Sequence, residues 1–178
     1  GFENTSVRVG TNLPASIAAS AGNGAVPRLA NTFVHSGTYS AKACFSANST
    51  QTQFMGCKFL LSSGEQALFE DGNIYELTSY VYYKPVSSQT ALSLRMGTIN
   101  GTNANEIESV YPTINKEEWT KLTLQFTYDA SKYTDGLNIK FVSGAIGSSD
   151  NYFIDDIKIE EVSEKSYFSK SCTFDFED

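Results

Sequence analysis

Apolar and polar residues alternate along most of this chain, and this two-residue period constrains the fold more than any other feature. In residues 75–84, Leu77, Val81 and Tyr83 fall on one face of an extended chain, and mostly polar or aromatic residues fall on the other. Helical periods of comparable length are missing from the sequence. The pattern predicts a strand of about ten residues with one buried face.

The same alternation recurs at short spacing and is interrupted by turn-forming residues. Asp71-Gly72, Asn100-Gly101 and Asp135-Gly136 supply the positive φ angles that tight connections need. We expect further strands at residues 39–45, 54–61, 92–96, 122–128, 137–142 and 152–162. Seven or more short strands predict an all-β fold, a β-sandwich jelly roll of two antiparallel sheets.

Length and composition indicate one domain. The 178 residues are 40% hydrophobic, enough for one buried core. We expect the sandwich to occupy residues 1–162, with residues 11–32 forming a long connection across one end. Residues 163–178 are predicted to be a linker whose last six residues, which echo the opening Gly1-Phe2-Glu3-Asn4, either begin a following module or add a final strand.

Charge excludes several partners. The formal net charge is −7, so nucleic acid and anionic membranes would be repelled. No run of eighteen apolar residues predicts a membrane span, and no signal peptide is recognisable, so we expect that any export signal has been removed. Cys44 and Cys57 either form a disulfide between neighbouring strands or are small buried residues, and Cys172 is left over.

Catalytic residues are scarce, so the sequence favours a non-enzymatic domain. His35 is the only histidine, and no nucleophile motif lies near it. Paired carboxylates such as Glu106 with Glu108 could be imagined as a glycosidase acid and base. The Glu117-Glu118 pair lies in a polar loop before a strand, where carboxylates are solvated rather than buried.

Five fragments, in this order and spacing, carry a resemblance to a known family. They are Gly1–Glu3, His35–Lys42, Gly72–Tyr82, Glu118–Leu122 and Tyr152–Ile157. Together they resemble the carbohydrate-binding modules of families 4, 9, 16 and 22, whose fold is a galactose-binding-like jelly roll. The resemblance implies a non-catalytic, monomeric module that is linked to other modules of a secreted or cell-surface bacterial glycoside hydrolase and holds it on polysaccharide.

The resemblance also implies a structural calcium ion. Its ligands would be Glu3, main-chain carbonyls around Gly37, and Asp155 or Asp156, a set of hard oxygen donors of the kind that calcium prefers. Asp155 shares the alternation of Phe153, so we expect its carboxylate to point inward while that of Asp156 points out. The alternative is that the two aspartates are a solvent-facing pair.

A sugar site needs aromatic planes that stack on sugar rings and polar groups around them. Tyr80 and Tyr82 project from one strand face about 7 Å apart and are the predicted stacking residues. The alternative is that both pack beneath the 11–32 connection. Trp119, the only tryptophan, begins a strand and is predicted to be structural.

Polar partners for the sugar hydroxyls are expected on the outward faces of other strands of the same sheet as Tyr80 and Tyr82. The candidates are Arg95, Gln125, Asn138 and Lys140. Arg95 could instead be an ordinary exposed arginine or pair with a surface acid.

A second type of sugar site would bind chain ends, and its residues would lie near loops or strand ends. Tyr111, Tyr133 and Tyr152 are the tyrosines placed there.

The expected ligand is β-1,4-xylan, or a β-glucan or mannan. The alternative function is a structural or adhesive spacer domain of a cell-surface protein, which would carry no groove aromatics.

Overall fold

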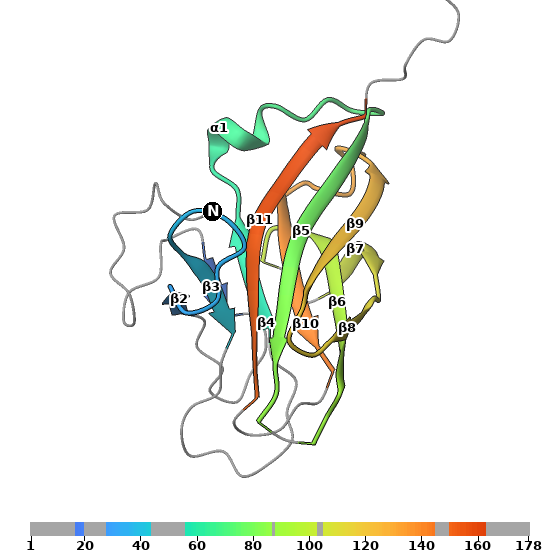
Figure 1. Cartoon of the computed structure of the whole chain (residues 1–178). Coiled ribbons are helices and arrows are strands. Elements are labelled where there is room, and N and C mark those ends of the chain that lie inside the picture. The colour runs from blue at the N-terminus through green and yellow to red at the C-terminus, as the bar shows by residue number, and fades with distance from the viewer. Residues whose placement is uncertain are drawn as a thin grey trace, which may run out of the picture.

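Two antiparallel sheets face each other in the computed structural model, which describes residues 17–19, 28–43, 56–86, 88–102, 105–144 and 150–162 (Figure 1). The first, the β10 sheet, has the strand order β1 (Ile17–Ala19), β4 (Gly56–Leu60), β10 (Leu137–Ser143), β6 (Ala91–Asn100), β7 (Glu106–Val110), with β8 (Thr113–Asn115) also pairing with β6. The second, the β5 sheet, has the order β2 (Arg28–Ala30), β3 (Ser40–Ala43), β11 (Asn151–Glu161), β5 (Ile74–Lys84), β9 (Trp119–Thr127). The predicted all-β sandwich is confirmed.

The core lies between the sheets and is built by the alternation seen in the sequence. On β5 the inward residues Leu77, Val81 and Tyr83 have no exposed surface, while their neighbours are partly exposed. From the other sheet, Leu92 and Phe141 close the core. Burial of these apolar side chains is the main stabilisation of the sandwich, because each removes a large area from water.

The long connection expected over residues 11–32 contains two short strands that were not predicted. β1 pairs with β4, and β2 pairs with β3, so each extends an edge of its sheet. Strands of three residues are too short to show an alternation, which is why the sequence pattern missed them.

The segment between β6 and β9 also holds strands that were not predicted. β7 has two glutamates among its five residues, and β8 is three residues long. A short helix, α1 (Ser63–Gln66), follows β4 and begins with a capping box in which Ser62 and Glu65 bond each other's backbone N–H groups. No helix in the described ranges has the length and apolar character needed to cross a membrane.

Several predictions fall on residues that the structure does not describe. Glu3, Cys44 and residues 163–178 lie outside the described ranges, so the N-terminal metal ligand and the role of the last segment stay predictions. Cys57 lies on β4 and is fully buried in the core. Its predicted pairing with Cys44 is therefore not tested.

Candidate functional site

The six predicted sugar-binding residues are divided between the two outer faces of the sandwich. In Figure 1, β5 and β9 run in front while β6 and β10 run behind them. The first pair of strands carries Tyr80, Tyr82 and Gln125, and the second carries Arg95, Asn138 and Lys140. The six residues therefore cannot line a single groove.

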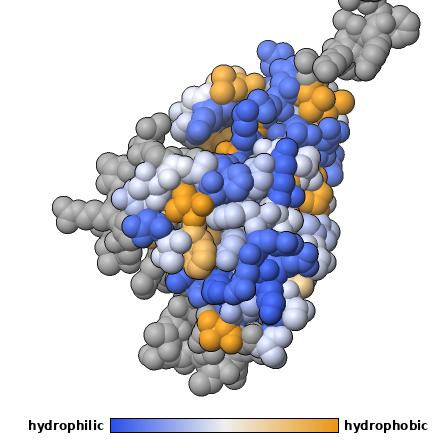
Figure 2. Space-filling model, in the orientation of Figure 1, coloured by the Kyte–Doolittle hydropathy of each residue, from blue (hydrophilic) through white to orange (hydrophobic). Residues whose placement is uncertain are grey.

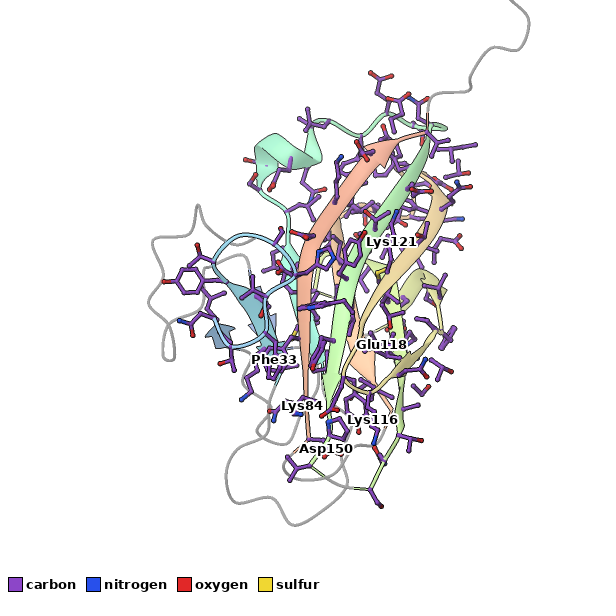
Figure 3. All side chains as sticks on the ribbon, in the orientation of Figure 1. Phe33, Lys84, Lys116, Glu118, Lys121 and Asp150 are labelled. Carbon is purple, nitrogen blue, oxygen red and sulfur yellow. The ribbon has the colours of Figure 1, made fainter. Side chains whose placement is uncertain are left out.

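On the β5 sheet, the loop of residues 31–39 between β2 and β3 covers both predicted stacking tyrosines. The His35 ring stacks on Tyr80 with centroids 3.6 Å apart, and the Phe33 ring stacks on Tyr82 at 4.7 Å. Phe33, labelled beside β11 in Figure 3, also contacts the Phe153 ring at 5.0 Å. The two tyrosines are thus packed beneath a loop, as in the alternative considered above, but the covering residues are 33 and 35 rather than 11–32.

Trp119 completes this aromatic cluster. Its ring meets His35 edge-on at 5.4 Å and lies 5.5 Å from Tyr82. Its contacts are packing contacts, in agreement with the structural role expected for it. The aromatic faces that the sequence made available for a sugar are therefore largely used within the protein itself.

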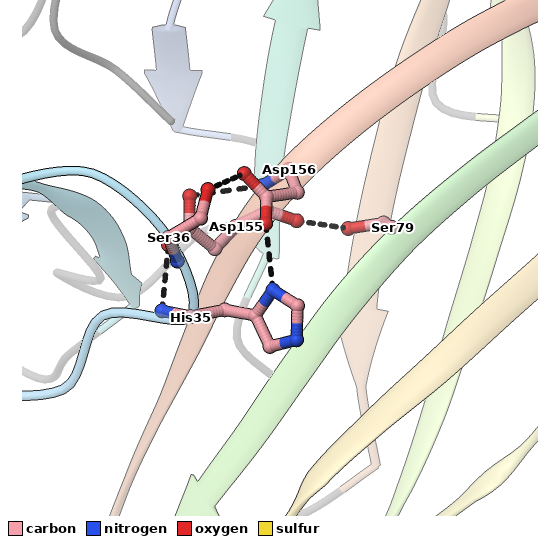
Figure 4. A network of polar contacts seen from close by, with 5 residues as sticks. All are labelled: His35, Ser36, Ser79, Asp155 and Asp156. Atoms are coloured by element: carbon pink, nitrogen blue, oxygen red, sulfur yellow. Dashed lines mark hydrogen bonds and ion pairs between the residues drawn. The ribbon is translucent and has the colours of Figure 1, made fainter.

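Two carboxylates hold the 31–39 loop in place (Figure 4). Asp155 Oδ2 accepts the backbone N–H of His35 at 2.9 Å and that of Ser36 at 3.3 Å. Asp156 accepts the Ser36 hydroxyl, and its Oδ2 lies 2.6 Å from His35 Nδ1. Both interactions join β11 to residues about 120 positions earlier, so no local pattern could have indicated them.

The direction predicted for Asp155 needs a correction. Its side chain is fully buried, but it faces outward from the sheet: Asp155 pairs with Tyr80 and Phe153 with Tyr82, both on the loop-covered side. Phe153 is apolar and only 3% exposed, as a core residue would be, but it is the 31–39 loop that covers it. A β-bulge between Asp155 and Lys158, with Asp156 at φ 48°, brings the second carboxylate to the same loop.

The two carboxyl groups have opposite electrostatic environments. Burial raises the pKa of Asp155, although the N–H groups of His35, Asp156 and Ser36 act against it. Burial also acts to raise the pKa of Asp156, but hydrogen bonds, those of Ser36 and His35 among them, outweigh it and lower that pKa to about 2. Asp156 is therefore the carboxylate that is firmly ionised.

The calcium ligands expected from the resemblance are partly brought together. Asp155, Asp156 and the Ser36–Gly37 turn converge, which gives hard oxygen donors of the right chemistry. These carboxylates are also well bonded by N–H and O–H donors. Within the described part of the chain, no group of three or more His, Cys, Asp and Glu side chains has the arrangement of a metal site. The donors fit calcium, but the described residues do not complete its shell.

The rest of the β5-sheet outer face is a mixed-charge surface. Figure 2 shows hydrophilic side chains over much of this side of the molecule, and Figure 3 places Lys84, Lys116, Glu118 and Lys121 there. Gln125 Nε2 donates to Glu76 Oε2 at 3.3 Å on the same face. Interspersed exposed charges of both signs are typical of a solvated surface.

The outer face of the β10 sheet has a different organisation, centred on Glu106. Its Oε1 lies 3.0 Å from both Arg95 Nε on β6 and Lys140 Nζ on β10. The side chains of Lys140 and Glu106 are 5% and 10% exposed, whereas that of Arg95 is 34% exposed. Arg95 is thus the member of this ion-pair cluster that water or a ligand reaches.

Gly97 makes room for this cluster. It lies opposite Lys140 on β10 and opposite Ser109 on β7. A Cβ at this position would lie 2.6 Å from the Glu108 carbonyl oxygen and 2.8 Å from Glu106 Cγ. Only a residue without a side chain lets Glu106 cross β6 to reach both cations.

Lys58 adds another positive charge beside the cluster. It lies opposite Lys140 in the β4–β10 pair, and its Nζ donates to the Thr102 carbonyl oxygen at 2.7 Å. Burial lowers the pKa of Lys58, and the like charge of Lys140 lowers it further. Asn138, by contrast, is 6% exposed and uses its amide to bind Leu61 N–H and the Gly101 carbonyl, so it fastens loops.

A groove opens next to Arg95. Tyr111, which is 66% exposed, lies in the connection between β7 and β8, and the Arg95 guanidinium carbon is 5.8 Å from its ring centre. Hydrogen bonding to Ser109 and to Arg95 lowers the pKa of the Tyr111 phenol. The groove has a volume of about 160 Å³ and is lined by Ser93, Arg95, Tyr111, Val142, Ser143 and Gly144.

This groove combines an open aromatic ring, a guanidinium and hydroxyl groups, which is the chemistry that a sugar ring and its hydroxyls require. A larger pocket of about 520 Å³ between the sheet ends near α1 is lined mainly by apolar side chains such as Phe59, Leu68 and Ile157. Its lining suits packing better than recognition of a polar ligand. Sequence reasoning selected Arg95 and named Tyr111 as a candidate for a chain-end site, but it missed Glu106 as the ion-pair partner of Arg95.

Comparisons with known proteins agree with the fold. No protein-family model matches the sequence, and no curated protein is similar to it. Solved structures do match. The chain is similar to the C-terminal family 22 carbohydrate-binding module of Clostridium thermocellum Xyn10B, with 16% identity, a TM-score of 0.56 and 91% of each chain covered. For that module, amino acids in a cleft have been studied for their role in ligand binding.

Two further structures extend this likeness. A xylan-binding family 22 domain of Paenibacillus barcinonensis Xyn10C is 16% identical, with a TM-score of 0.54 and coverage of 83% of this chain and 86% of that one. A two-module piece of Clostridium thermocellum xylanase 10B, solved with xylohexaose, is 13% identical with a TM-score of 0.52. The match covers 83% of this chain but 26% of that longer protein. At these identities the likeness establishes the jelly-roll fold.

Proposed function

We propose that this sandwich is a non-catalytic carbohydrate-binding module that attaches a larger glycan-active protein to polysaccharide, with β-1,4-xylan as the first candidate ligand. One observation carries the proposal: the groove on the β10-sheet outer face, where the exposed Tyr111 ring lies against Arg95. A ring free on one side offers a stacking plane, and the guanidinium and nearby hydroxyls offer hydrogen bonds to sugar hydroxyls.

The similar solved structures support the choice of ligand class. Xylan-binding modules share the fold, and one of them binds ligand through a cleft. Because the groove here is also a cleft on one sheet face, the same class of ligand suits it. The binding function is therefore assigned to Arg95 and Tyr111, while Tyr80 and Tyr82 are assigned to holding the 31–39 loop.

The environments of the candidate catalytic carboxylates argue against an enzyme. Glu106 Oε1 lies 3.0 Å from both Arg95 Nε and Lys140 Nζ, so this carboxylate is occupied by ion pairs within the protein. Hydrogen bonding to Lys84 lowers the pKa of Glu117. Glu118 accepts a hydrogen bond from Asn115 at 2.7 Å on an exposed loop. These residues have the surroundings of structural or solvated acids.

A module of this kind acts outside the cell, as one part of a longer polypeptide. Support comes from the xylanase 10B piece, in which the matching part is about a quarter of a chain that also holds a catalytic module. The acidic net charge of −7 suits a neutral polysaccharide better than nucleic acid or an anionic membrane.

The proposal is tested by affinity gel electrophoresis against soluble xylan, β-glucan and mannan. Tyr111→Ala removes the stacking plane, and we expect it to weaken binding about tenfold, since an aromatic contact of this kind contributes on the order of 1–2 kcal/mol. Leu68→Ala is the matched control, because Leu68 is 72% exposed and lines the pocket near α1 rather than the groove.

Both variants should keep the wild-type unfolding temperature, because both side chains are largely exposed. Equal retardation of Tyr111→Ala and wild type would refute the assignment of the site. Loss of binding by variants in the Tyr80–Tyr82 cluster, with folding intact, would place the site on the other face. A chain that binds none of the three polysaccharides would instead be a spacer domain.

We further propose that a structural calcium ion is held beside the 31–39 loop by Asp155, Asp156 and carbonyl groups around Gly37, with Glu3 completing its shell. The support is the convergence of the two carboxylates on the Ser36–Gly37 turn. Bound calcium would neutralise the two adjacent acids and tie the loop to β11.

Titration calorimetry, in which calcium is added to protein that a chelator has freed of metal, tests this site without any sugar. We expect saturable binding of one ion, and a gain of about 2.7 kcal/mol in stability at a hundredfold excess over the dissociation constant. Asp156→Asn should abolish the heat of binding, and an unchanged titration in this variant would contradict the site.

A further inference from the structure

We infer that the Arg95 groove takes one sugar residue that has a single glycosidic bond, such as the residue at the end of a xylan chain, rather than a stretch from the middle of a chain. This inference rests on the proposed function and names the part of the polysaccharide that the groove binds. It arises from the size of the groove and from the way in which its Arg95 end is closed.

The groove is long enough for one sugar ring. On β6 it runs from Ser93 to Arg95, two positions that share a strand face and lie about 7 Å apart. Its volume is about 160 Å³. A cavity of about 150 Å³ holds one benzene ring, and a pyranose is also a six-membered ring. The groove therefore has room for one sugar residue, whereas a bound stretch of several residues needs several such volumes.

The two long sides of the groove are fixed by backbone hydrogen bonds to β6. On one side, Leu94 N–H donates to the Pro112 carbonyl oxygen at 3.1 Å, which holds the connection that carries Tyr111. On the other side, Gly144 N–H donates to the Ser93 carbonyl oxygen at 2.6 Å, and a Cβ at Gly144 would lie 3.3 Å from Ser93 Cβ. The width of the groove is therefore set by hydrogen-bonded backbone.

The Arg95 end of the groove is closed by the Glu106 ion-pair cluster. Glu106 on β7 reaches over Gly97 of β6 toward Lys140 on β10, so the cluster crosses three adjacent strands. The side chains of Lys140 and Glu106 are 5% and 10% exposed, so the surface is filled where they lie, and neither lines the groove. A polysaccharide that lies along β6 cannot continue past Arg95 without a steric conflict, and such conflicts give a site its specificity.

One aromatic ring serves the groove. Of the three tyrosines that the sequence placed near loops or strand ends, Tyr133 and Tyr152 are buried and Tyr111 is exposed. Among the described residues that line the groove, Tyr111 is the only aromatic one, and one ring stacks on one sugar residue. A terminal residue carries a hydroxyl group where an internal residue has its second glycosidic bond. Arg95, at the closed end, is placed to donate to such a hydroxyl.

The first test is a length series. Titration calorimetry measures the binding of xylobiose, xylotetraose and xylohexaose to the whole chain. We expect the three affinities to agree within about twofold, because each oligosaccharide places one terminal residue in the groove. A groove that binds internal stretches would instead gain affinity several-fold with each added ring.

Two polysaccharide experiments identify the source of the residue. Limited digestion of insoluble xylan by an endoxylanase, followed by washing, adds chain ends, so more protein should bind per gram of xylan. Arabinoxylan is compared before and after removal of its single arabinose side groups, which shows whether the groove takes a side group instead.

A variant that fills the groove ties the result to this site. Ser93 is exposed and lines the groove, so Ser93→Phe should weaken binding of the disaccharide and of the hexasaccharide equally, by about tenfold. Thr123→Phe, at an exposed outward position of β9 on the other sheet, is the matched control and should bind as wild type does. Unfolding curves verify that each variant is folded.

The outcomes separate this inference from the proposed function. Affinity that rises with each residue up to the hexasaccharide would overturn the inference and leave the xylan-binding module intact. Binding of arabinoxylan that is lost with its arabinose would support a residue with a single glycosidic bond and place it on a side group. No binding of any xylan or oligosaccharide would overturn both. Length-independent binding that Ser93→Phe leaves unchanged would overturn the assignment to this groove.

Discussion

The two outer faces of the sandwich differ in how their aromatic and charged side chains are packed. On the β5 sheet, aromatic rings stack on each other and two aspartates hold the covering loop. On the β10 sheet, one open tyrosine stands beside a partly exposed arginine. The comparison teaches that residue type alone does not mark a binding site, because the face richer in aromatics is the closed one.

The same comparison holds for the charges. Asp155 and Asp156 are satisfied by N–H and O–H groups of the loop that they hold. On the β10 sheet, Glu106 pairs with Arg95 and Lys140, and the Arg95 side chain stays 34% exposed beside the groove. Polar groups that are satisfied and covered stabilise structure, whereas an accessible charged group is available to a ligand. The following changes test this division, starting with the largest expected effect.

Asp155→Ala should destabilise the protein by about 2 kcal/mol, because it leaves the partly buried N–H groups of His35, Ser36 and Asp156 without their acceptor. Denaturant unfolding in the presence of a chelator measures this effect apart from calcium. Asp155→Asn keeps one acceptor oxygen, so its free energy of unfolding should fall by about half as much. Glycan affinity of the folded fraction should not change, and a parallel loss of affinity would mean that the two faces are coupled.

Gly97→Ala is the corresponding test on the open face. The added methyl group would clash with the Glu108 carbonyl and Glu106, so β7 must shift at a cost of about 2 kcal/mol. Because Glu106 orients Arg95, glycan affinity should also fall several-fold. Gly64→Ala is the control, since nothing lies within 4 Å of a Cβ there. If Gly97→Ala bound glycan normally, the Glu106 cluster would not be what positions Arg95.

Phe33→Ala uncovers Tyr82 and should cost about 1.5 kcal/mol, because it removes ring contacts with Tyr82 and Phe153. Phe69→Ala, which removes comparable contacts with Tyr75 and Tyr128, is a control for stability. Glycan affinity measured by gel retardation should stay the same in both variants. Tighter binding by Phe33→Ala would reveal the tyrosines as a covered sugar site and would break the comparison.

Glu117→Gln should have the smallest effect. Glu117 forms an ion pair with Lys84, and both side chains are well exposed, so solvent screens the interaction. Because the pKa of Glu117 is lowered, any stability that the ion pair contributes is present above the pKa of this residue in the unfolded chain. That stability is lost as the pH falls. Thermal unfolding at pH 7 should match wild type within error. A clear loss would show that the mixed-charge surface contributes to the fold.

Much of the fold was predictable because its signal is local. The strands at β5, β6, β9, β10 and β11 follow from alternation, and the Asn-Gly and Asp-Gly turns mark their ends. β1, β2 and β8 were missed because three residues are too few to show a period. For β7, the polar residues of an edge strand concealed it.

The candidate site was less predictable. Arg95 and Lys140 face outward as predicted, but they lie on the other sheet from Tyr80 and Tyr82. Asn138, chosen by the same rule, binds backbone groups of two loops. Tyr80 and Tyr82 also face outward as predicted, yet a loop covers them. Alternation gives the side of the strand to which a residue belongs, but it carries no information about what lies over that side.

The sequence by itself determined the strands, their inward faces and the two-sheet class, since these depend on neighbours two residues apart. Only the tertiary structure decided which outer face is open. That choice depends on His35 reaching Asp155 and Asp156, and on Gly97 letting Glu106 reach across β6. Such contacts join residues that lie far apart in the chain or on different strands, and they exist only once strand pairing and the β11 bulge have fixed the register.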